Sequence, residues 1–297
     1  MIIKSRRKSR EARAGYLFIL PAVILFLCFV AFPLIVSFGL MFCDYNLIQA
    51  PEIVGMTNLL KFFNDREVGS IFLNSLKLLA VLVPTHVVLG LALAYLVNET
   101  GKKLSGVYRV IIYLPTIMTT VSVATAWSYL YDTDFGVINY YLGKIGIGKI
   151  PWLASSKWAL AAIILFSIWK FVGTPFLYYY IGLQGIPASL YEAAEIDGAN
   201  RREKFRYVTL PMLTSTIFMV IVLSFISYLQ CFDEPYVLTK GGPGISTTTV
   251  SLYIYRNFQA QNISYASILS VVLFIIIMII TALQFKASNK WVNYDSE

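Results

Sequence analysis

Long apolar stretches alternate with short polar ones along the chain of 297 residues. A helix that crosses a membrane needs about 20 mostly apolar residues, and six stretches are long enough. They cover residues 16–43, 71–97, 107–131, 158–182, 208–232 and 265–285. Because a chain in lipid must satisfy its own backbone hydrogen bonds, the pattern predicts an all-α, polytopic membrane protein with six transmembrane helices. Residues 16–285 then form one transmembrane domain, and residues 1–15 and 286–297 are terminal tails.

The composition agrees with this class. Charged residues make up 13% of the chain, against about 25% in soluble domains. The net charge of +8 could indicate a nucleic-acid partner, but retention of Lys and Arg on the cytoplasmic side of a membrane explains it more simply. We therefore expect contact with membrane lipid and no nucleic acid.

The distribution of Lys and Arg predicts the orientation of the chain. Fifteen of them fall in the N-terminal tail, the second and fourth loops and the C-terminal tail, whereas seven fall in the other loops. Since positive charge is enriched in cytoplasmic loops, both termini and the loop between the fourth and fifth spans are expected to be cytoplasmic. The result is a multi-pass protein of the cell membrane.

The sequence contains no clear metal or disulfide pattern. Cys28, Cys43 and Cys231 are odd in number and form no C-x-x-C motif, so neither a disulfide framework nor a zinc site is indicated. His86 is the single histidine, and we interpret it as a packing residue whose hydrogen bonds are satisfied. The first apolar stretch lacks a small-residue cleavage site near its end, which indicates a retained span rather than a signal peptide.

The loop between the fourth and fifth spans has a distinct pattern of helix signals. Ser189 precedes Glu192 by three residues, and this capping box predicts a helix that opens near residue 190. Gly198 is expected to end that helix in the left-handed conformation, and Asn200 with Glu203 predicts the start of a second one. Taken alone, these residues are compatible with a docking surface for a soluble partner or with an amphipathic helix on lipid headgroups.

The same loop resembles the EAA loop of the inner-membrane permease subunits of binding-protein-dependent ABC importers. The shared residues are Glu192-Ala193-Ala194, Asp197-Gly198-Ala199 and Leu210-Pro211. Further stretches are similar to the sugar-type branch, which includes the maltose and glycerol-3-phosphate permeases. They are Tyr113-Leu-Pro115, Gly136-Val-Ile-Asn139, Leu183-Gln-Gly-Ile-Pro187 and Gly241-Gly-Pro243. The short outer segment 44–70 departs from the maltose-type subunit, which has a large inserted domain there.

The resemblance implies that residues 187–207, the coupling loop, sit in a groove of a cytoplasmic ATPase. The implied contact residues are Glu192, Ala193, Ala194, Asp197 and Gly198. We add Tyr191, because its side chain could fill a pocket of the partner. The implied partners are a second, related permease subunit in a heterodimer, two ATPase subunits and an extracellular solute-binding protein. The chain has no G-x-x-x-x-G-K-[ST] phosphate loop, so we expect no cofactor or catalytic residue in it, and ATP and Mg on the ATPase subunits.

Two pairs of residues are candidates for the substrate pathway. Lys170 lies in the middle of the fourth span, where an ammonium group is costly unless it faces protein or a water-filled cavity. Trp169 beside it could stack on a sugar ring. The alternative for Lys170 is a structural pairing with a carbonyl or carboxylate group. Tyr228 and Gln230 are candidates in the outer half of the fifth span, because the resemblance places the sugar site there.

The expected function is therefore import of a sugar, oligosaccharide or related polyol, with this chain forming half of the pathway. A stand-alone secondary transporter or channel is the alternative, and it predicts acidic residues inside the spans for ion coupling. No Asp or Glu falls within the six predicted spans, and Asp233 and Glu234 are expected to form a solvated rim just beyond the fifth. An intramembrane enzyme would need a catalytic constellation that the sequence does not provide.

Overall fold

The computed structural model describes residues 15–292, which divide into two compact units. The first contains the chain up to Asn64 together with Arg256–Val272, and the second contains Asp65–Tyr255 and the chain from Leu273 onward. Residues 1–14 of the predicted N-terminal tail lie outside the described residues, as do residues 293–297 of the predicted C-terminal tail.

The first unit opens with the apolar helix Gly15–Leu40. Its middle turn, η1 (Leu27–Ala31), is π-helical, and its last part is α2 (Phe32–Leu40). A two-residue hairpin of β1 (Cys43–Asp44) and β2 (Glu52–Ile53) follows, and then α3 (Thr57–Asn64). The Asn58 amide fastens the hairpin by donating to the Cys43 carbonyl over 2.6 Å. No residue of η1 or α2 is buried, so this apolar surface needs lipid or protein to cover it.

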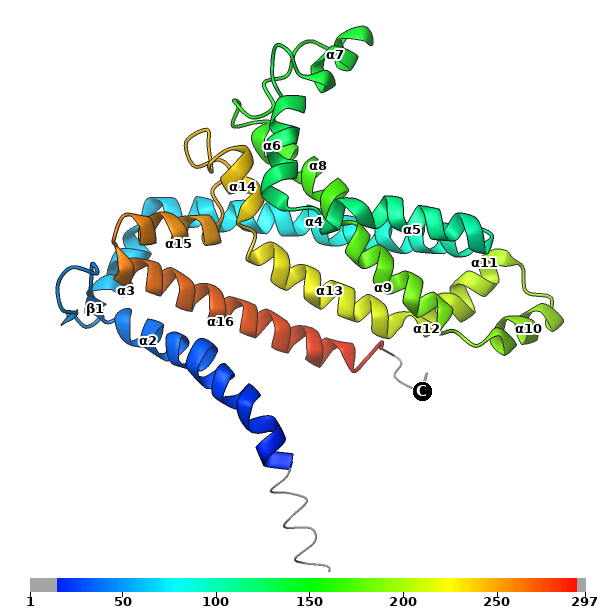
Figure 1. Cartoon of the computed structure of the whole chain (residues 1–297), viewed down its shortest axis with the longest axis horizontal. Helices are drawn as coiled ribbons and strands as arrows, with labels where there is room; N and C mark the ends of the chain where they lie inside the picture. Colours follow the sequence, from blue (N-terminus) through cyan, green and yellow to red (C-terminus); the bar gives the residue numbers. More distant parts are fainter. Residues whose placement is uncertain (1–14, 293–297) are drawn as a thin grey trace, which may run out of the picture. The chain divides into compact units, whose positions relative to one another are not determined.

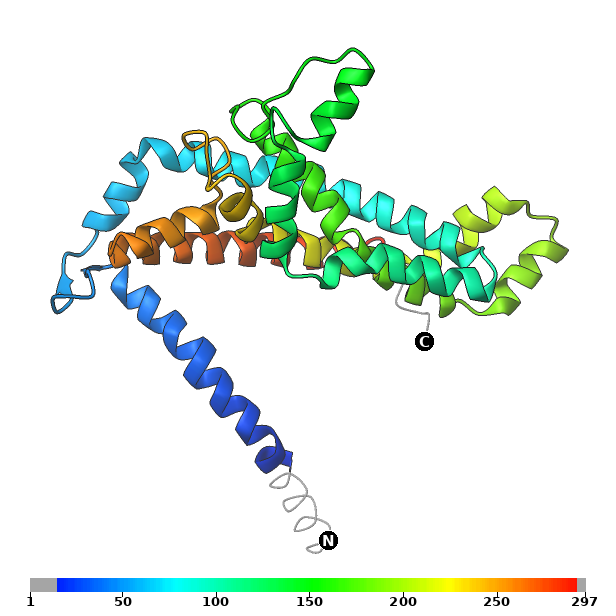
Figure 2. The same cartoon turned by 45° about the horizontal axis from the view of Figure 1, so that its top comes forward.

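The second unit is a helical bundle (Figures 1 and 2). Its helices are α4 (Arg66–Asn98), α5 (Lys102–Ile117), α6 (Thr120–Leu130), α7 (Val137–Lys144), α8 (Ala159–Phe171), α9 (Gly173–Gln184), α10 (Ala188–Ile196), α11 (Arg201–Lys204), π-helical η2 (Phe205–Thr209), α12 (Leu210–Met212), α13 (Thr214–Leu229) and α14 (Asp233–Leu238). The helices α15 (Val250–Gln259) and α16 (Ile263–Ser288) contribute residues to both units. Thus α16 extends two residues past 286, where the sequence pattern places the start of the tail.

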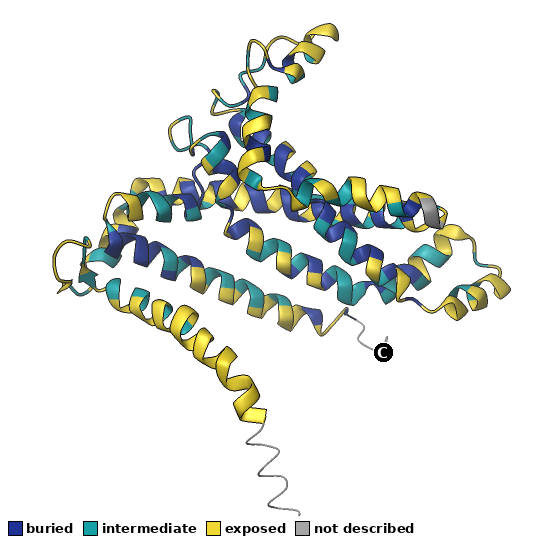
Figure 3. Ribbon diagram, in the orientation of Figure 1, coloured by how far each residue is buried: buried dark blue, intermediate teal, exposed yellow. Residues whose placement is uncertain are grey.

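The core of the second unit forms around α4, which packs against α8, α9 and α13. Figure 3 shows buried residues gathered along these helices. Gly90 on α4 permits a close approach of α9, because a Cβ atom there would lie 2.9 Å from Cβ of Pro175. This approach positions α9, whose residues line the pocket described below.

The third predicted span differs most from expectation. The pattern predicts one continuous helix over 107–131, but the structure has α5 and α6, which are bent by 94°. Met118 and Thr119 at the break adopt extended backbone with ψ of 149° and 131°. Such a break is tolerated within a membrane where other groups satisfy the freed carbonyls, and hydropathy alone does not reveal those groups.

Among the described residues, five helices are long and apolar enough to cross a membrane, or six when α5 and α6 are counted as one bent span. The strands β1 and β2 are the sole sheet in this part of the chain. The all-α membrane fold is therefore confirmed.

Candidate functional site

The coupling loop begins at α10, whose start differs from the prediction. The helix opens at Ala188 after Pro187, and no side chain caps it. Proline needs no hydrogen-bond partner for its nitrogen at a helix start, so it can open the helix before Ser189 does. The predicted capping box of Ser189 and Glu192 is therefore wrong, because Ser189 lies inside the first turn.

The turn after α10 forms as predicted. Gly198 has a φ of +80°, in the left-handed region that glycine enters without a steric cost. Its N–H donates to the Glu195 carbonyl over 3.0 Å, and the Ala199 N–H donates to the Ala194 carbonyl over 2.9 Å. This pair of bonds is a Schellman motif, which satisfies carbonyls at the helix end.

The second predicted cap is also confirmed. The Asn200 side chain accepts the N–H groups of Arg202 and Glu203 over 3.0 and 3.1 Å. In return, the Glu203 carboxylate accepts the Asn200 N–H over 2.7 Å. This reciprocal capping box starts α11, which continues through η2 and α12 toward α13.

Two side-chain contacts tie α10 to the segment that follows it. The Tyr191 hydroxyl lies 3.0 Å from the Thr209 hydroxyl on η2. The Lys204 ammonium donates to the Glu195 carboxylate over 2.5 Å, and this hydrogen bond, aided by the lysine charge, lowers the pKa of Glu195. These two contacts join α10 to α11 and η2 in addition to the backbone.

A third contact holds α11 to the end of α4. Arg201 forms an ion pair with Glu99, and its Nε donates to the Tyr95 hydroxyl over 3.4 Å. The hydrogen bond with Tyr95, followed by the charge of Glu99, raises the pKa of Arg201. The start of α11 is thus fixed to α4, while α10 projects from the unit (Figures 1 and 2).

The projecting helix α10 has no buried residue. Of the six predicted coupling residues, Glu192, Ala193, Asp197 and Gly198 are exposed, and Tyr191 and Ala194 are half-buried. Ile196 is 87% exposed and Leu190 is 39% exposed. The described residues thus leave the apolar side chains of α10 uncovered.

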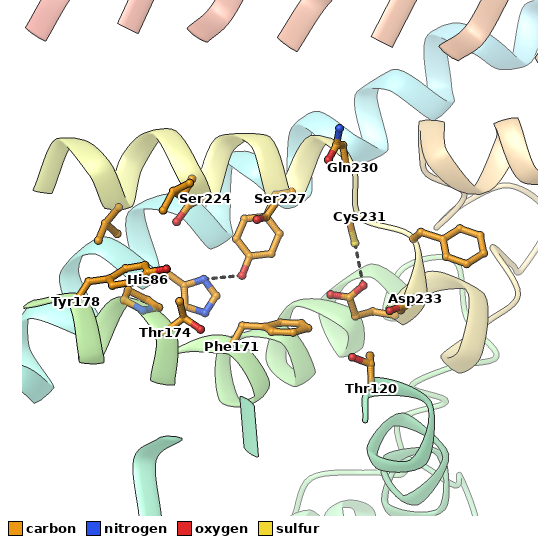
Figure 4. A pocket seen from close by; sticks show the side chains of 16 residues that line it. His86, Thr120, Phe171, Thr174, Tyr178, Ser224, Ser227, Gln230, Cys231 and Asp233 are labelled. Carbon is orange, nitrogen blue, oxygen red and sulfur yellow. Dashed lines mark hydrogen bonds between the residues drawn. The ribbon is translucent and has the colours of Figure 1, made fainter. Parts of the chain in front are cut away.

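A pocket of about 520 Å³ lies beside α13, and we name it the α13 pocket. This volume is within the roughly 300–1,000 Å³ of small-molecule sites. Polar and aromatic side chains from α4, the start of α6, the α8–α9 region, α13 and the start of α14 line it (Figure 4). The main ones are His86, Thr120, Phe171, Thr174, Tyr178, Ser224, Ser227, Tyr228, Gln230, Phe232, Asp233 and Glu234.

His86 and Tyr228 form one wall of the α13 pocket. Nδ1 of His86 lies 2.8 Å from the Tyr228 hydroxyl, and the two rings are parallel with centroids 5.5 Å apart. Both residues are buried, and Nε2 of His86 has no hydrogen-bond partner among the described residues. The interpretation of His86 as a fully satisfied packing residue is therefore wrong for one of its two nitrogens.

The predicted solvated rim is only half present. Asp233 is exposed, but Glu234 is buried, with 6% of its surface accessible. The Cys231 thiol donates to the Glu234 carboxylate over 3.3 Å. The apolar helical segment also runs on to Leu238, beyond the predicted end of the fifth span. An acidic side chain is consequently buried near the end of this segment, although none was expected within a span.

The structure separates the four predicted pathway residues into two pairs. Tyr228 and Gln230 line the α13 pocket, whereas Trp169 and Lys170 do not. Trp169 is 41% exposed and packs against Trp127 with ring centroids 5.2 Å apart.

Lys170 instead holds the break between α5 and α6. Its ammonium donates to the carbonyls of Pro115 and Met118 over 2.6 Å each and to that of Thr116 over 3.2 Å. The Thr116 hydroxyl donates back to the Lys170 carbonyl over 3.0 Å. The last carbonyls of a helix lack intrahelical partners, and a cation there also interacts favourably with the helix dipole. The geometry thus matches the structural alternative given for Lys170.

Sequence reasoning missed several residues of the pocket. Thr174 and Tyr178 flank Pro175 in an otherwise apolar stretch, and polar side chains around a proline in a span were an available signal. Glu234 and His86 gave no such signal, because their surroundings come from distant parts of the chain. Among residues 15–292, no group of three His, Cys, Asp or Glu could hold a metal ion.

Comparisons with known proteins agree with one another. A family model described as the binding-protein-dependent transport system inner membrane component matches residues 86–294. The probable ABC transporter permease protein YesP of Bacillus subtilis is 38% identical, over 99% of this chain and 96% of that protein. The trehalose/maltose transport system permease protein MalF of Thermococcus litoralis is 34% identical, over 97% of each chain.

A solved structure is similar along nearly the whole chain. It is a crystal structure of a bacterial ABC transporter involved in the import of the acidic polysaccharide alginate. The TM-score is 0.83 at 24% sequence identity, and the match covers 98% of this chain and all of the other. At this identity the likeness establishes the fold.

Proposed function

The chain belongs to the inner-membrane components of binding-protein-dependent transport systems, and from this premise we propose that it forms half of the pathway of an ATP-driven sugar importer. It is a multi-pass membrane transport subunit. The observation that supports the proposal most is the combination of an exposed, rigidly capped coupling loop with a polar and aromatic pocket at opposite ends of α13.

The lining of the α13 pocket supports a carbohydrate substrate. Ser224, Ser227 and Gln230 offer hydrogen bonds to hydroxyl groups, and Phe171 and Phe232 offer flat apolar faces. Relatives include permeases of trehalose/maltose and lactose transport systems. The substrate class is therefore a sugar, oligosaccharide or related polyol.

The charge of the pocket favours an uncharged substrate. Asp233 and Glu234 line it, and none of the Lys and Arg residues that the structure describes does. A carboxylate-bearing sugar would meet like charge there, which costs affinity. In this respect the cargo differs from the acidic polysaccharide named for the structurally similar alginate transporter.

The coupling loop supports a docked ATPase. Ala193 leaves room for close approach, and Leu190 and Ile196 offer exposed apolar anchors. Two ATPase subunits, with their ATP and Mg, would supply the energy, since this chain has no phosphate-binding loop. When the ATPase pair closes, α10 moves with it, and the contacts of Tyr191 and Glu195 transmit the movement toward α13.

The remaining subunits follow from the same architecture. A second, related permease subunit would complete the pathway as a heterodimer, and an extracellular binding protein would deliver the sugar. The distribution of Lys and Arg supports cytoplasmic termini, with the coupling loop on the same side.

Reconstitution into proteoliposomes tests the proposal. We expect sugar uptake to require ATP, the ATPase subunits and the binding protein, and we expect this chain alone to transport nothing. Uptake by the chain alone would refute the proposal and support a stand-alone transporter.

Two pairs of variants test the coupling loop. Ala193→Trp places bulk on an exposed face at no cost to the fold and is expected to abolish co-purification of the ATPase, whereas Ala188→Trp, exposed at the start of the same helix, should not. Gly198→Ala and Gly146→Ala strain the backbone alike, because both glycines have φ near +80° and open space around them. Left-handed backbone costs a non-glycine residue about 1–2 kcal/mol, so a roughly tenfold loss of uptake is expected for Gly198→Ala only. Equal co-purification of the ATPase with the two Trp variants, or equal uptake by the two Ala variants, would contradict the assignment of α10 and Gly198 to ATPase coupling.

A further inference from the structure

A second cavity lies beside the C-terminal half of α4, and we name it the α4 groove. Its volume is about 550 Å³, and its wall is made by apolar side chains of α4 that include Val88, Leu91 and Leu96. Val88 is 67% exposed and Leu96 is 60% exposed. Tyr95 and Phe205 close one side through an edge-to-face contact with centroids 4.9 Å apart.

The groove has a cationic mouth. Arg201 and Arg202 from the coupling loop line it. The charge of Arg201 is balanced by Glu99, but the described residues provide no ion pair for Arg202, which is exposed. The α4 groove is therefore apolar along α4 and has one uncompensated positive charge, that of Arg202, at its mouth.

This arrangement matches the chemistry of one class of ligand. A phospholipid has apolar acyl chains and, in the anionic class, a net negative headgroup. Basic pockets between transmembrane helices on the cytoplasmic side bind such headgroups, and the distribution of Lys and Arg places the coupling loop on that side. A neutral apolar helix of another subunit would fill the α4 groove but would leave Arg202 without a counter-charge.

We propose that the α4 groove binds an anionic phospholipid of the inner leaflet, with an acyl chain against α4 and the headgroup phosphate on Arg202. The lipid touches both α4 and Phe205, the first residue of η2. It therefore occupies the joint between α4 and the segment that continues from the coupling loop. Its binding is a property of this joint and is independent of which solute is transported.

Native mass spectrometry of the purified assembly tests the proposal. The delipidated assembly is titrated with phosphatidylglycerol or with phosphatidylcholine of the same acyl chains. We expect tighter binding of phosphatidylglycerol, and we expect Arg202→Gln to weaken it about fivefold, the effect of one cation near a lipid surface. Arg206→Gln is the matched control, because Arg206 is exposed two residues beyond α11 but does not line the groove.

A second variant tests the acyl-chain site without changing charge. Ala92→Trp fills the groove and is expected to reduce binding of both lipids, whereas Val107→Trp on α5, exposed outside the groove, should reduce neither. Equal binding of the two lipids, or equal effects of Arg202→Gln and Arg206→Gln, would overturn the proposal. A disulfide formed under mild oxidation between Val88→Cys and a cysteine introduced into a helix of the partner permease, with no lipid retained, would also overturn it, since the groove would then be a subunit contact.

Discussion

Lys170→Met is the substitution whose effect the structure defines most sharply. Methionine has a similar length and no charge, so it keeps the volume of the side chain and removes the ammonium. Three backbone carbonyls, those of Pro115, Thr116 and Met118, then lose their donor. The side chain is 1% exposed, so bulk water cannot replace it without opening the break between α5 and α6.

The expected cost comes from two opposing effects. A buried polar group left without a partner costs about 1–3 kcal/mol, and three carbonyls are involved. Removal of the ammonium also ends the cost of burying a charge in the membrane, which offsets part of the loss. We expect the free energy of unfolding to fall by about 3 kcal/mol, which lowers Tm by roughly 6–12 °C.

Thermal unfolding of the detergent-solubilised protein measures this effect. Cys28 and Cys43 are replaced by Ser, so that a thiol-reactive fluorophore reports the exposure of the buried Cys231. Lys77→Met is the control, because Lys77 lies on the exposed face of α4, also within an apolar helix. A Tm for Lys170→Met equal to that of Lys77→Met would refute the role of this ammonium as the cap of α5.

Three further outcomes follow from single contacts. Tyr228→Phe leaves the His86 ring without its hydroxyl partner. We expect the free energy of unfolding to fall by about 1–3 kcal/mol and the KM for uptake to rise. Unchanged uptake kinetics would exclude this wall of the α13 pocket from the pathway. Lys204 lowers the pKa of Glu195 below its usual 4.5, so their pairing contributes stability above that pH and loses it as the pH falls through the lowered pKa. Amide exchange over residues 188–204 should therefore be slower in the unaltered protein than in Glu195→Gln at pH 7, and the two exchange rates should become equal in acid. Asn139→Ala removes an amide that donates hydrogen bonds to two carbonyls and accepts them from a backbone N–H and an indole N–H. We therefore expect faster proteolysis of residues 131–158 than in the unaltered protein.

The local parts of the fold could be predicted from the sequence because their causes are local. The Gly198 turn and the Asn200–Glu203 box each depend on residues within one or two helical turns, and both are confirmed. The Ser189 cap failed for a reason that is also local. Pro187 starts α10 without a side-chain cap, and a proline at that position could have been weighed against the capping box.

The α13 pocket could be predicted only in part, because its chemistry depends on contacts between distant residues. His86 and Tyr228 are 142 positions apart in the chain, and no pattern in either helix indicates the other. Glu234 lies just beyond the predicted end of the fifth span, where the hydropathy pattern predicts contact with solvent. The fold nevertheless buries it beside Cys231. The same limit applies to Lys170, whose carbonyl partners are freed by a break that hydropathy does not detect.

The proposed route from the coupling loop to the pocket depends on how tightly α9 packs against the start of α13. A Cβ atom on Gly182 of α9 would lie 2.9 Å from both the Leu213 side chain and the Thr216 hydroxyl. Leu213 is buried and follows α12 directly, so the start of α13 lies closely against α9 at Gly182. Packed elements of this kind shift as a body rather than deform. Because α9 contributes Tyr178 and α13 contributes Ser227 to the pocket, we expect a push on α10 that reaches Leu213 in the proposed transport cycle to move both walls together, since breaking this packing would destroy the proposed binding site.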